Sequence, residues 1–458
     1  MANRAVDDSN KENKEASAMS EVQIPDQFPT AGQDWANYVA GYDTIDTPLK
    51  AVLTFDGHLD AELISRAVRL SIDAEPVLGC RFVEHPKQPS WERFESIDDR
   101  TWCRIEVTDD HQAALQQFMQ GNPEPKEQLV HVLVIRTEQH DTLCVVLDHA
   151  YCDASGVKEY LQLVSRIYGE LCKDSGYVPE VNASGTRDAS DVFRALGYPN
   201  AASAVRGQAP ASKPTWAFPY VRESANEQLR VGMRRLSQAE FKQLRSYGKE
   251  HRATVNDLLL AVFYRAMFAF VAPKAYEPME VTTAVNLRRY LPNEQAASIC
   301  NLSGIETVKL ARMAGEPFVA TLRRAVQGMN QIKQGTPGIQ NAAAMEMLRN
   351  MDYKDVNMFL RGARQRLVAG GMATPLFSNF GLVADHPFTF GDRAVADAYF
   401  ISSAAYPPGL IFGFSSYNQV LTLTISFYEP AIRKEDVEAF LDLCMQELAF
   451  CTKENVHS

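Results

Sequence analysis

The chain has 458 residues and a formal net charge of −11, from 57 acidic and 46 basic side chains. This acidic balance argues against a nucleic-acid backbone as the main partner, because phosphate binding requires clustered Lys and Arg. The hydrophobic fraction of 46% and the charged fraction of 22% are typical of a globular protein. The length exceeds one ordinary compact core and therefore predicts two domains.

Neither a membrane span nor a secretion signal is expected from the sequence. The most apolar run, residues 258–272, contains Arg265 and is shorter than the roughly 20 residues of a spanning helix, so it predicts a buried helix. Residues 1–25 lack an apolar signal core and are expected to be a disordered tail. The eight cysteines are scattered, without a CxxC pair or zinc-like spacing. We therefore expect reduced thiols, a cytoplasmic location and no metal site.

Apolar runs and helical periodicity predict a mixed pattern in the first half of the chain. Strands are expected over residues 48–55, 77–82, 91–97, 129–136 and 142–147. Only polar residues join the last two strands, which predicts a hairpin. Asp60 is in the N-cap position of a helix, and residues 156–171 form a second helix with one apolar stripe.

The middle of the chain predicts a linker between two lobes. Residues 173–226 are rich in Ala, Ser, Gly and Pro, with few periodic apolar positions, and hold one short helix near residues 191–196. The expected division has four parts. They are a tail (1–25), an N-terminal lobe (26–175), a crossover linker (176–226) and a C-terminal lobe (227–458).

The second half repeats the mixed pattern. Strands are expected over residues 229–236, 279–285, 378–383, 398–403, 410–416 and 420–427. Helices are expected after residue 237 and over residues 254–270, 316–333, 341–365 and 434–450. Ser237 and Glu240 form a capping box, and Thr254 caps the most apolar helix. Both halves combine sheets and helices without strict βαβ alternation, so the predicted fold class is α/β, of the α+β kind.

The strongest chemical signal lies where the strand at residues 142–147 ends. His149 and Asp153 follow it in an HxxxD pattern, and a helix is expected from Gly156. A strand-to-helix junction holds side chains rigidly at the end of a sheet. The carboxylate can brace the loop while the imidazole faces a cleft. The pattern alone is weak, and a loop histidine beside a capping Asp is the competing interpretation.

The motif resembles that of the condensation-domain and chloramphenicol-acetyltransferase superfamily. This group includes nonribosomal peptide condensation domains, BAHD acyltransferases, wax ester synthases and polyketide-associated acyltransferases. Their motif is HHxxxDG, or HxxxD in looser members, and His149 and Asp153 match its second His and its Asp. Asp148 and Ala154 replace the first His and the Gly, so the role of that first His is not carried over to this chain.

Other segments match the family in the expected order. Arg288, in the run Val-Asn-Leu-Arg-Arg at 285–289, matches the family Arg that pairs with the motif Asp. Residues 300–304 (Cys-Asn-Leu-Ser-Gly), 378–381 (Ser-Asn-Phe-Gly) and 60–82 resemble further family segments. The resemblance spans about residues 30–450, and only HxxxD is specific.

The resemblance implies two chloramphenicol-acetyltransferase-like lobes in a V, with an active-site tunnel between them. His149 would be the general base that activates a hydroxyl or amine to attack a thioester, while Asp153 and Arg288 would form a buried ion pair. Acyl-CoA or a phosphopantetheine thioester would be a co-substrate, with no bound cofactor. The expected partners are this donor, a small-molecule acceptor and, as a candidate, an acyl or peptidyl carrier protein. Neither nucleic acid nor integral membrane contact is expected, and secondary metabolism is the expected setting.

Further residues are candidates for stabilising the reaction intermediate. The backbone N–H of Gly156, at the expected start of a helix, could donate to an oxyanion. Ser378 and Asn379 could also donate, although a structural role in a strand is the commoner interpretation. Cys152 within the motif could be a nucleophile, but a cysteine at a strand end is more often a packing residue.

Two other functions compete with acyl transfer. The replaced first His favours a non-catalytic condensation-like module that binds an acyl carrier or partner protein. A wax ester or diacylglycerol synthase acting at a lipid surface is the other candidate, and it should show a basic or apolar surface helix. The acidic net charge argues against this last interpretation.

Overall fold

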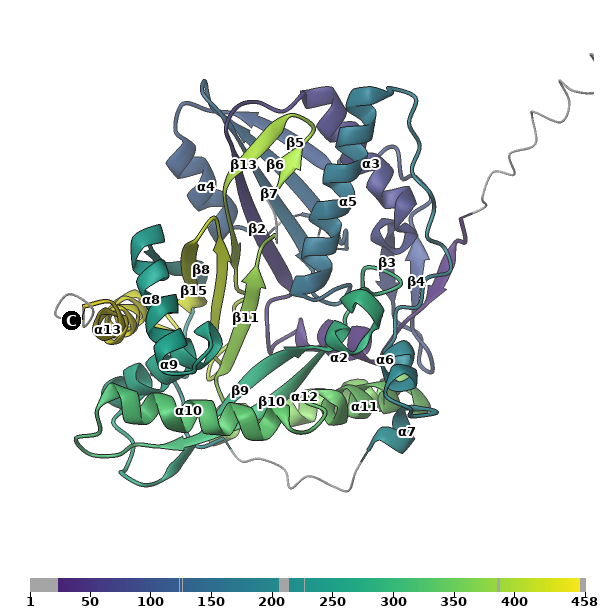
Figure 1. Ribbon diagram of the computed structural model, residues 1–458. Helices are drawn as coiled ribbons and strands as arrows, with labels where there is room; N and C mark the ends of the chain where they lie inside the picture. The colour runs from purple at the N-terminus through teal and green to yellow at the C-terminus, as the bar shows by residue number, and fades with distance from the viewer. Residues whose placement is uncertain are drawn as a thin grey trace, which may run out of the picture.

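Two six-stranded β-sheets form the framework of the protein (Figure 1). The computed structural model describes residues 24–453, apart from residues 123, 126, 206–213, 226 and 385–387. The predicted tail at residues 1–25 therefore lies outside the described residues, except for its last two. Helices and sheets are mixed in both halves, as the α/β prediction requires.

The first sheet has the strand order β12-β13-β2-β7-β6-β5. Its strands are β12 (Thr389–Phe390), β13 (Arg393–Ile401), β2 (Pro48–Phe55), β7 (Asp141–Asp148), β6 (Val130–Arg136) and β5 (Cys103–Val107). The predicted hairpin of β6 and β7 is present and antiparallel, whereas β5 runs parallel to β6. Helices α3 (Ala61–Ala74) and α5 (Ala154–Lys173) cover one face, and α4 (His111–Gln120) covers the other (Figure 1).

Local sequence explains the centre of this sheet. β7 is buried along nearly its whole length, because helices cover both faces of the central strands, and its sequence is accordingly a continuous apolar run. Asp60 caps α3 as predicted, its carboxylate accepting the backbone N–H groups of Glu62 and Leu63 at 2.9 Å. The sheet therefore holds the end of β7, where the motif begins, on a rigid support.

A small third sheet has the order β1-β4-β3, from β1 (Gln27–Pro29), β4 (Ser90–Arg93) and β3 (Cys80–Val83). The strand predicted over residues 77–82 is only partly right. Pro76 starts a short 3₁₀ helix, Pro76–Gly79, because its fixed φ suits the first helical position, and the strand begins only at Cys80. Between β1 and β2 lies α2 (Gly32–Ala40), a helix not predicted from the sequence.

The second sheet has the order β10-β9-β11-β14-β15-β8. Its strands are β10 (Ser303–Ala311), β9 (Pro278–Asn286), β11 (Leu376–Leu382), β14 (Ile411–Tyr417), β15 (Val420–Glu429) and β8 (Gln228–Leu236). A second core joins it to α8 (Gln238–Glu250), α9 (Val255–Val271), α10 (Phe318–Lys333) and α13 (Lys434–Lys453). Both predicted caps are present, on Ser237 and on Thr254. Among the described residues no single helix is long and apolar enough to cross a membrane, although α8 and α9, bent by 98°, pass that test as a pair.

The helix predicted over residues 341–365 is two helices. α11 (Ile339–Met347) continues into a 3₁₀ turn, Leu348–Asn350, and α12 (Tyr353–Gly370) follows. The chain becomes extended at Met351 and at Asp352, the N-cap of α12, which interrupts the helix. The linker contains α6 (Ser190–Ala195), close to the predicted short helix, and α7 (Ala201–Ala204).

The two sheets do not follow the predicted division of the chain at residue 226. β12 and β13 come from the second half but belong to the first sheet, where β13 pairs with β2 from Ile401–Lys50 to Val395–Phe55. Conversely, α2 from the first half packs against α11 and α12. Without β13, β2 would be an open sheet edge, and unpaired edges are costly to leave exposed. Each half of the chain therefore contributes an element to the framework of the other.

Candidate active site

The HxxxD loop connects the end of β7 to the start of α5. The backbone N–H groups of Tyr151 and Cys152 turn back onto the carbonyl of Asp148, at 3.0 and 3.3 Å. Ala150, Tyr151 and Cys152 are fully buried in the first core, whereas His149 is only half-buried. The loop is thus anchored by its middle residues, and it presents His149 beside the second half of the chain.

The shorter of two contacts at Nδ1 favours one tautomer of the His149 imidazole, the other contact being the Asn37 amide nitrogen at 3.5 Å. Its Nδ1 lies 2.9 Å from the carbonyl oxygen of Cys152. A carbonyl only accepts, so Nδ1 carries the proton and Nε2 keeps a lone pair. The structure gives no hydrogen-bond partner for Nε2 within its described residues. A neutral histidine in this tautomer can take a proton through Nε2 from a nucleophile.

Two asparagines hold the backbone of His149. Asn301 donates its amide to the carbonyls of His149 and Ala150, both at 3.0 Å, and Asn37 of α2 donates to the His149 carbonyl at 3.1 Å. Asn301 is 1% exposed. The loop is therefore hydrogen-bonded to α2 on one side and to the segment before β10 on another.

Asp153 stabilises the far end of the loop. It caps α5 by accepting the Gly156 N–H at 2.8 Å, and it also accepts the Leu302 N–H at 2.8 Å. Arg288 donates Nη1 to both carboxylate oxygens, at 2.9 and 3.0 Å. The contact between Asp153 and Arg288 that the resemblance implies is thus present in the structure. Asp153 points to these partners, and it contacts the loop rather than the His149 ring.

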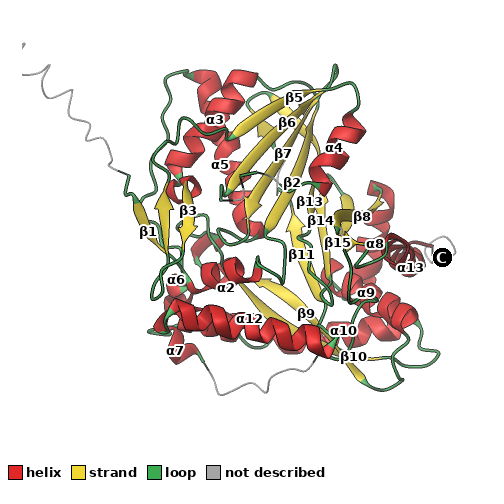
Figure 2. Cartoon of the chain, turned by 180° about the vertical axis from the view of Figure 1, so that it is seen from behind, coloured by secondary structure: helices red, strands yellow, loops and turns green. Residues whose placement is uncertain are grey.

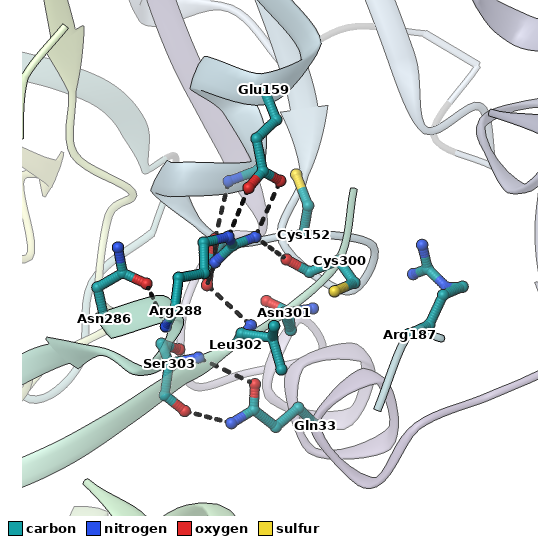
Figure 3. Close-up of polar contacts among 12 residues, drawn as sticks. Gln33, Cys152, Glu159, Arg187, Asn286, Arg288, Cys300, Asn301, Leu302 and Ser303 are labelled. Atoms are coloured by element: carbon teal, nitrogen blue, oxygen red, sulfur yellow. Dashed lines mark hydrogen bonds and ion pairs between the residues drawn. The ribbon is translucent and has the colours of Figure 1, made fainter. Parts of the chain in front are cut away.

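Arg288 crosslinks the two halves of the chain (Figure 3). It belongs to the 3₁₀ turn Leu287–Tyr290 that follows β9, and it also pairs with Glu159 of α5 at 2.6 Å and donates to the Cys300 carbonyl at 3.0 Å. Burial disfavours its charged form, but the Asp153 and Glu159 carboxylates outweigh burial and raise the pKa of Arg288. Because these partners satisfy the guanidinium, its burial at 2% exposure is tolerable.

A second buried ion pair supports the loop, and sequence reasoning missed it. Arg187 of the linker donates to the carbonyls of Tyr151 at 2.9 Å and Ile299 at 2.5 Å, and it lies over the Tyr151 ring at 4.5 Å. Its counter-ion is Asp34 of α2, at 3.8 Å. Burial raises the pKa of Asp34, and Arg187 opposes that shift. No sequence pattern distinguishes an arginine in a low-periodicity linker, so only the structure identifies it.

Three predicted residues do not fit the roles considered for them. The Gly156 N–H is already bonded to Asp153, so it is not free to bind an oxyanion. Burial raises the pKa of the Cys152 thiol well above its usual value, which leaves little thiolate to act as a nucleophile. Asn379 of β11 donates to Asn256 at 3.1 Å and accepts from the Gly381 N–H at 2.8 Å, which is a local strand role.

Ser378 is the other side chain that the sequence offers as a donor. It lies on β11, the second-sheet strand that neighbours β9 and β14, and it is half-buried. Within the described residues its hydroxyl has no hydrogen-bond partner in the structure. Its role as a donor stays a prediction, since among the described residues no hydrogen bond joins it to the HxxxD loop.

Asp148, which stands where stricter family members have a histidine, has structural contacts of its own. Its carboxylate accepts the Thr47 hydroxyl at 2.7 Å and the Ala150 N–H at 2.8 Å. Burial raises its pKa. Asp148 also lines a pocket of about 140 Å³. Through Gln128 and His131 this pocket adjoins a second one of about 570 Å³, under α4.

The residues of the site do not resemble a metal centre. In the described part of the chain no group of three or more His, Cys, Asp or Glu side chains is placed to hold a metal ion. The chemistry that the arrangement supports is proton transfer by one imidazole, with two buried ion pairs that fix its loop.

Comparison with known structures identifies the fold. The chain has the fold of nonribosomal peptide synthetase condensation domains, of a trichothecene acetyltransferase and of a polyketide synthase associated protein. The trichothecene 15-O-acetyltransferase from Fusarium sporotrichioides is similar with a TM-score of 0.67 and 13% identity, over 93% of this chain and 95% of that one. No protein-family model and no curated protein matches the chain by sequence.

Two further structures cover the whole fold. Polyketide synthase associated protein 5 from Mycobacterium tuberculosis has a TM-score of 0.63 and 14% identity, over 92% of this chain and all of that one. The starter condensation domain of rhizomide synthetase, solved with C8-CoA, has a TM-score of 0.60 and 14% identity, over 96% and 97% of the two chains. At such identities the likeness establishes the fold alone.

Proposed function

We propose that the chain is an acyltransferase that moves an acyl group from a thioester to a hydroxyl or amine, with His149 as the general base. The observation that carries this proposal is the 2.9 Å contact between His149 Nδ1 and the Cys152 carbonyl, because it leaves the Nε2 lone pair available. Two structural neighbours add support, since one is named as an O-acetyltransferase and another was solved with C8-CoA. The donor is accordingly an acyl-CoA or an acyl group on a carrier protein.

The reaction needs only one proton carrier. His149 Nε2 takes the proton of the acceptor hydroxyl or amine as its oxygen or nitrogen attacks the thioester carbonyl. The tetrahedral intermediate then collapses, the carbon–sulfur bond breaks, and the thiolate leaves with the proton that the imidazolium returns. Ser378 is the remaining candidate to donate to the oxyanion. Asp153 and Arg288 act as positioning residues, because they contact the loop and each other.

The test compares the wild type with His149→Ala. Thiol release is followed with octanoyl-CoA, acetyl-CoA and octanoyl-pantetheine, each with pooled alcohols and amines. Loss of the base should lower the acceptor-dependent rate by about 10²–10⁴-fold. His140→Ala, in the turn between β6 and β7, is the matched control and should keep the wild-type rate. An unchanged rate in His149→Ala would refute the role of this residue as the base.

A second candidate is a binding module without chemistry. Asp148 favours it, since the residue that replaces the first family histidine is bonded to Thr47 and to the loop backbone. A module of this kind would bind an acyl-pantetheine without cleaving it. Turnover by the purified wild type with any of the three donors rules this candidate out, whereas binding without thiol release would favour it.

A further inference from the structure

The pocket under α4 is large enough to hold a small molecule. Its volume of about 570 Å³ lies within the roughly 300–1,000 Å³ of ligand pockets, whereas protein interiors leave few voids larger than a water molecule. The helix α4 forms one side of it, and the strands β6 and β7 form another. In Figure 2, α4 lies between the strands of the first sheet and β8 of the second. We call this space the α4 pocket, defined by Trp102, Ala114, Phe118, His131, Leu133 and Val146.

A buried lysine holds the end of α4 beside the pocket. Lys50 of β2 is 4% exposed, and its Nζ donates to the carbonyls of Met119 at 2.9 Å and Gly121 at 2.7 Å. Carbonyls at the end of a helix lack partners within it, so the ammonium caps α4. Lys50 pairs with Val146 across β2 and β7, and the two side chains therefore share the α4 side of the sheet. A buried cation and an empty apolar space both lower stability, and a fold that keeps both together indicates that the space is used.

Three polar side chains of the lining already have partners inside the protein. The Gln128 amide donates to two backbone carbonyls, at 3.1 and 2.7 Å. Trp102 Nε1 donates to a third carbonyl at 2.8 Å. His131 Nε2 lies 3.0 Å from the Gln128 carbonyl, and burial lowers the pKa of His131, which favours the neutral imidazole. An occupant therefore needs no charge to neutralise these groups and few hydrogen bonds to satisfy them.

The two arginines of the lining also have partners. Arg100 pairs with Glu127 at 3.5 Å and lies over the Phe94 ring at 3.4 Å. Arg104, whose side chain is 70% exposed, lies 3.9 Å from Glu106, which lines the pocket too. Recognition of a phosphate or carboxylate favours cations that converge on the ligand and are not already paired. The pocket is therefore poorly suited to an anion.

We propose that the α4 pocket is a binding site for an uncharged, largely apolar small molecule, separate from the site of acyl transfer. The apolar side chains of Phe118, Leu133 and Val146 supply the contact area, and the paired charges of the lining leave no preference for an ionic ligand. The described residues that line this pocket and its smaller neighbour include Asp148 but not His149. The inference therefore goes beyond the proposed acyl transfer and does not depend on it.

The test uses two fluorescent probes, uncharged N-phenylnaphthylamine and anilinonaphthalene sulfonate, which differ by one sulfonate. The wild type should bind the uncharged probe at one saturable site, roughly tenfold or more tightly than the sulfonate, because burial disfavours an unpaired charge. Leu133→Trp fills the pocket from β6, and Gln117→Trp covers it from an exposed position of α4. Each should weaken binding of the uncharged probe by roughly tenfold or more. Gln112→Trp, exposed on α4 outside the lining, is the matched control.

Competition with octanoyl-CoA separates this site from the proposed catalytic site. The thioester should leave the bound probe in place, whereas displacement would assign the pocket to the acyl donor and overturn the proposal. Wild-type affinity in both tryptophan variants, with their folding checked by thermal unfolding, would overturn it as well. The same holds if the wild type binds both probes equally tightly, or if it shows no saturable binding of the uncharged probe.

Discussion

At the scale of single residues, two buried arginines hold the HxxxD loop from opposite sides. Arg288 satisfies its guanidinium with Asp153, Glu159 and the Cys300 carbonyl. Arg187 is less completely satisfied, because its Nε has no hydrogen-bond partner in the described structure. Buried charges are tolerated only when they are paired and hydrogen-bonded. Removing one partner leaves the other charge buried and unpaired, which lowers the stability of the fold considerably.

The first prediction concerns the stability that depends on Arg288. Arg288→Met leaves Asp153 and Glu159 without their cation, and the free energy of unfolding should fall by about 3–5 kcal/mol. Urea denaturation followed by tryptophan fluorescence measures it. The control is Arg194→Met, which removes an exposed pair with Asp191 and should cost no more than about 1 kcal/mol. Equal losses in the two variants would contradict the structural role of Arg288.

The second prediction concerns positioning by Arg187. Arg187→Met frees the carbonyls of Tyr151 and Ile299, so the loop should shift and kcat should fall by roughly 10²-fold, with a smaller change in KM. Arg187→Lys keeps the charge beside Asp34 but loses the planar fork, and it should recover only part of kcat. Thermal unfolding separates this effect from misfolding. Full activity in Arg187→Met would exclude a positioning role.

At the scale of elements, helices and strands with strong local sequence patterns could be predicted, and those with weak patterns could not. The strand β7 contains a continuous apolar run, and β2 and β15 are mostly apolar and buried. The helices α3, α8 and α9 have side-chain caps in the sequence. α2 was missed because its N-cap is Ala31, which has no side-chain oxygen. Asn37 and Asp34 were missed along with it.

In the candidate site, too, the residues in strong local patterns could be predicted and the others could not. His149, Asp153 and Arg288 are identifiable because they lie in short motifs that resemble a known family. Glu159 is one of several charged residues on α5, and nothing in the sequence singles it out. Asn301 lies in a segment that resembles the family, but its bonds to the loop depend on how the two halves pack. Contacts across 150 residues of sequence follow from tertiary structure and not from local pattern.

The third prediction concerns pH and the end of α3. Glu75 follows this helix and accepts the Asn182 amide at 2.8 Å, and burial raises its pKa to about 7. Between its usual value of 4.5 and about 7, the folded state binds the proton more tightly than the unfolded state. Stability should therefore fall as pH rises through this window and change little above it.

Glu75→Gln tests this pH dependence. The variant should match the wild type near pH 4.5 and have a higher unfolding temperature at pH 8, because it removes the cost of ionising Glu75. Part of the slope should remain, since burial also raises the pKa of Glu346 to about 7. Glu62→Gln, at the exposed start of α3, is the control and should leave the slope as in the wild type. A wild-type slope in Glu75→Gln would contradict the assignment.

At the scale of the whole molecule, each half of the chain completes the other. β13 closes the edge of β2 in the first sheet, and α2 buries Trp35 and Val39 against α12 of the second half. Arg288 and Arg187 add polar crosslinks at the loop itself. The candidate site thus depends on contacts between segments far apart in sequence, and the base can be held in place only while both sheets are intact.

This interdependence predicts a single cooperative unfolding transition, although chains of this length often unfold in separable steps. Leu53→Ala on β2 and Leu423→Ala on β15 remove fully buried side chains from the first and second cores, and each should cost about 2–5 kcal/mol. Differential scanning calorimetry should show both variants lowering the temperature of the same transition. Two transitions, each moved by only one variant, would mean that the lobes unfold independently. In that case the exchange of β13 does not couple the two lobes. Coupled lobes would unfold together, because neither lobe can stay folded once the other has lost the strand or helix that the two share.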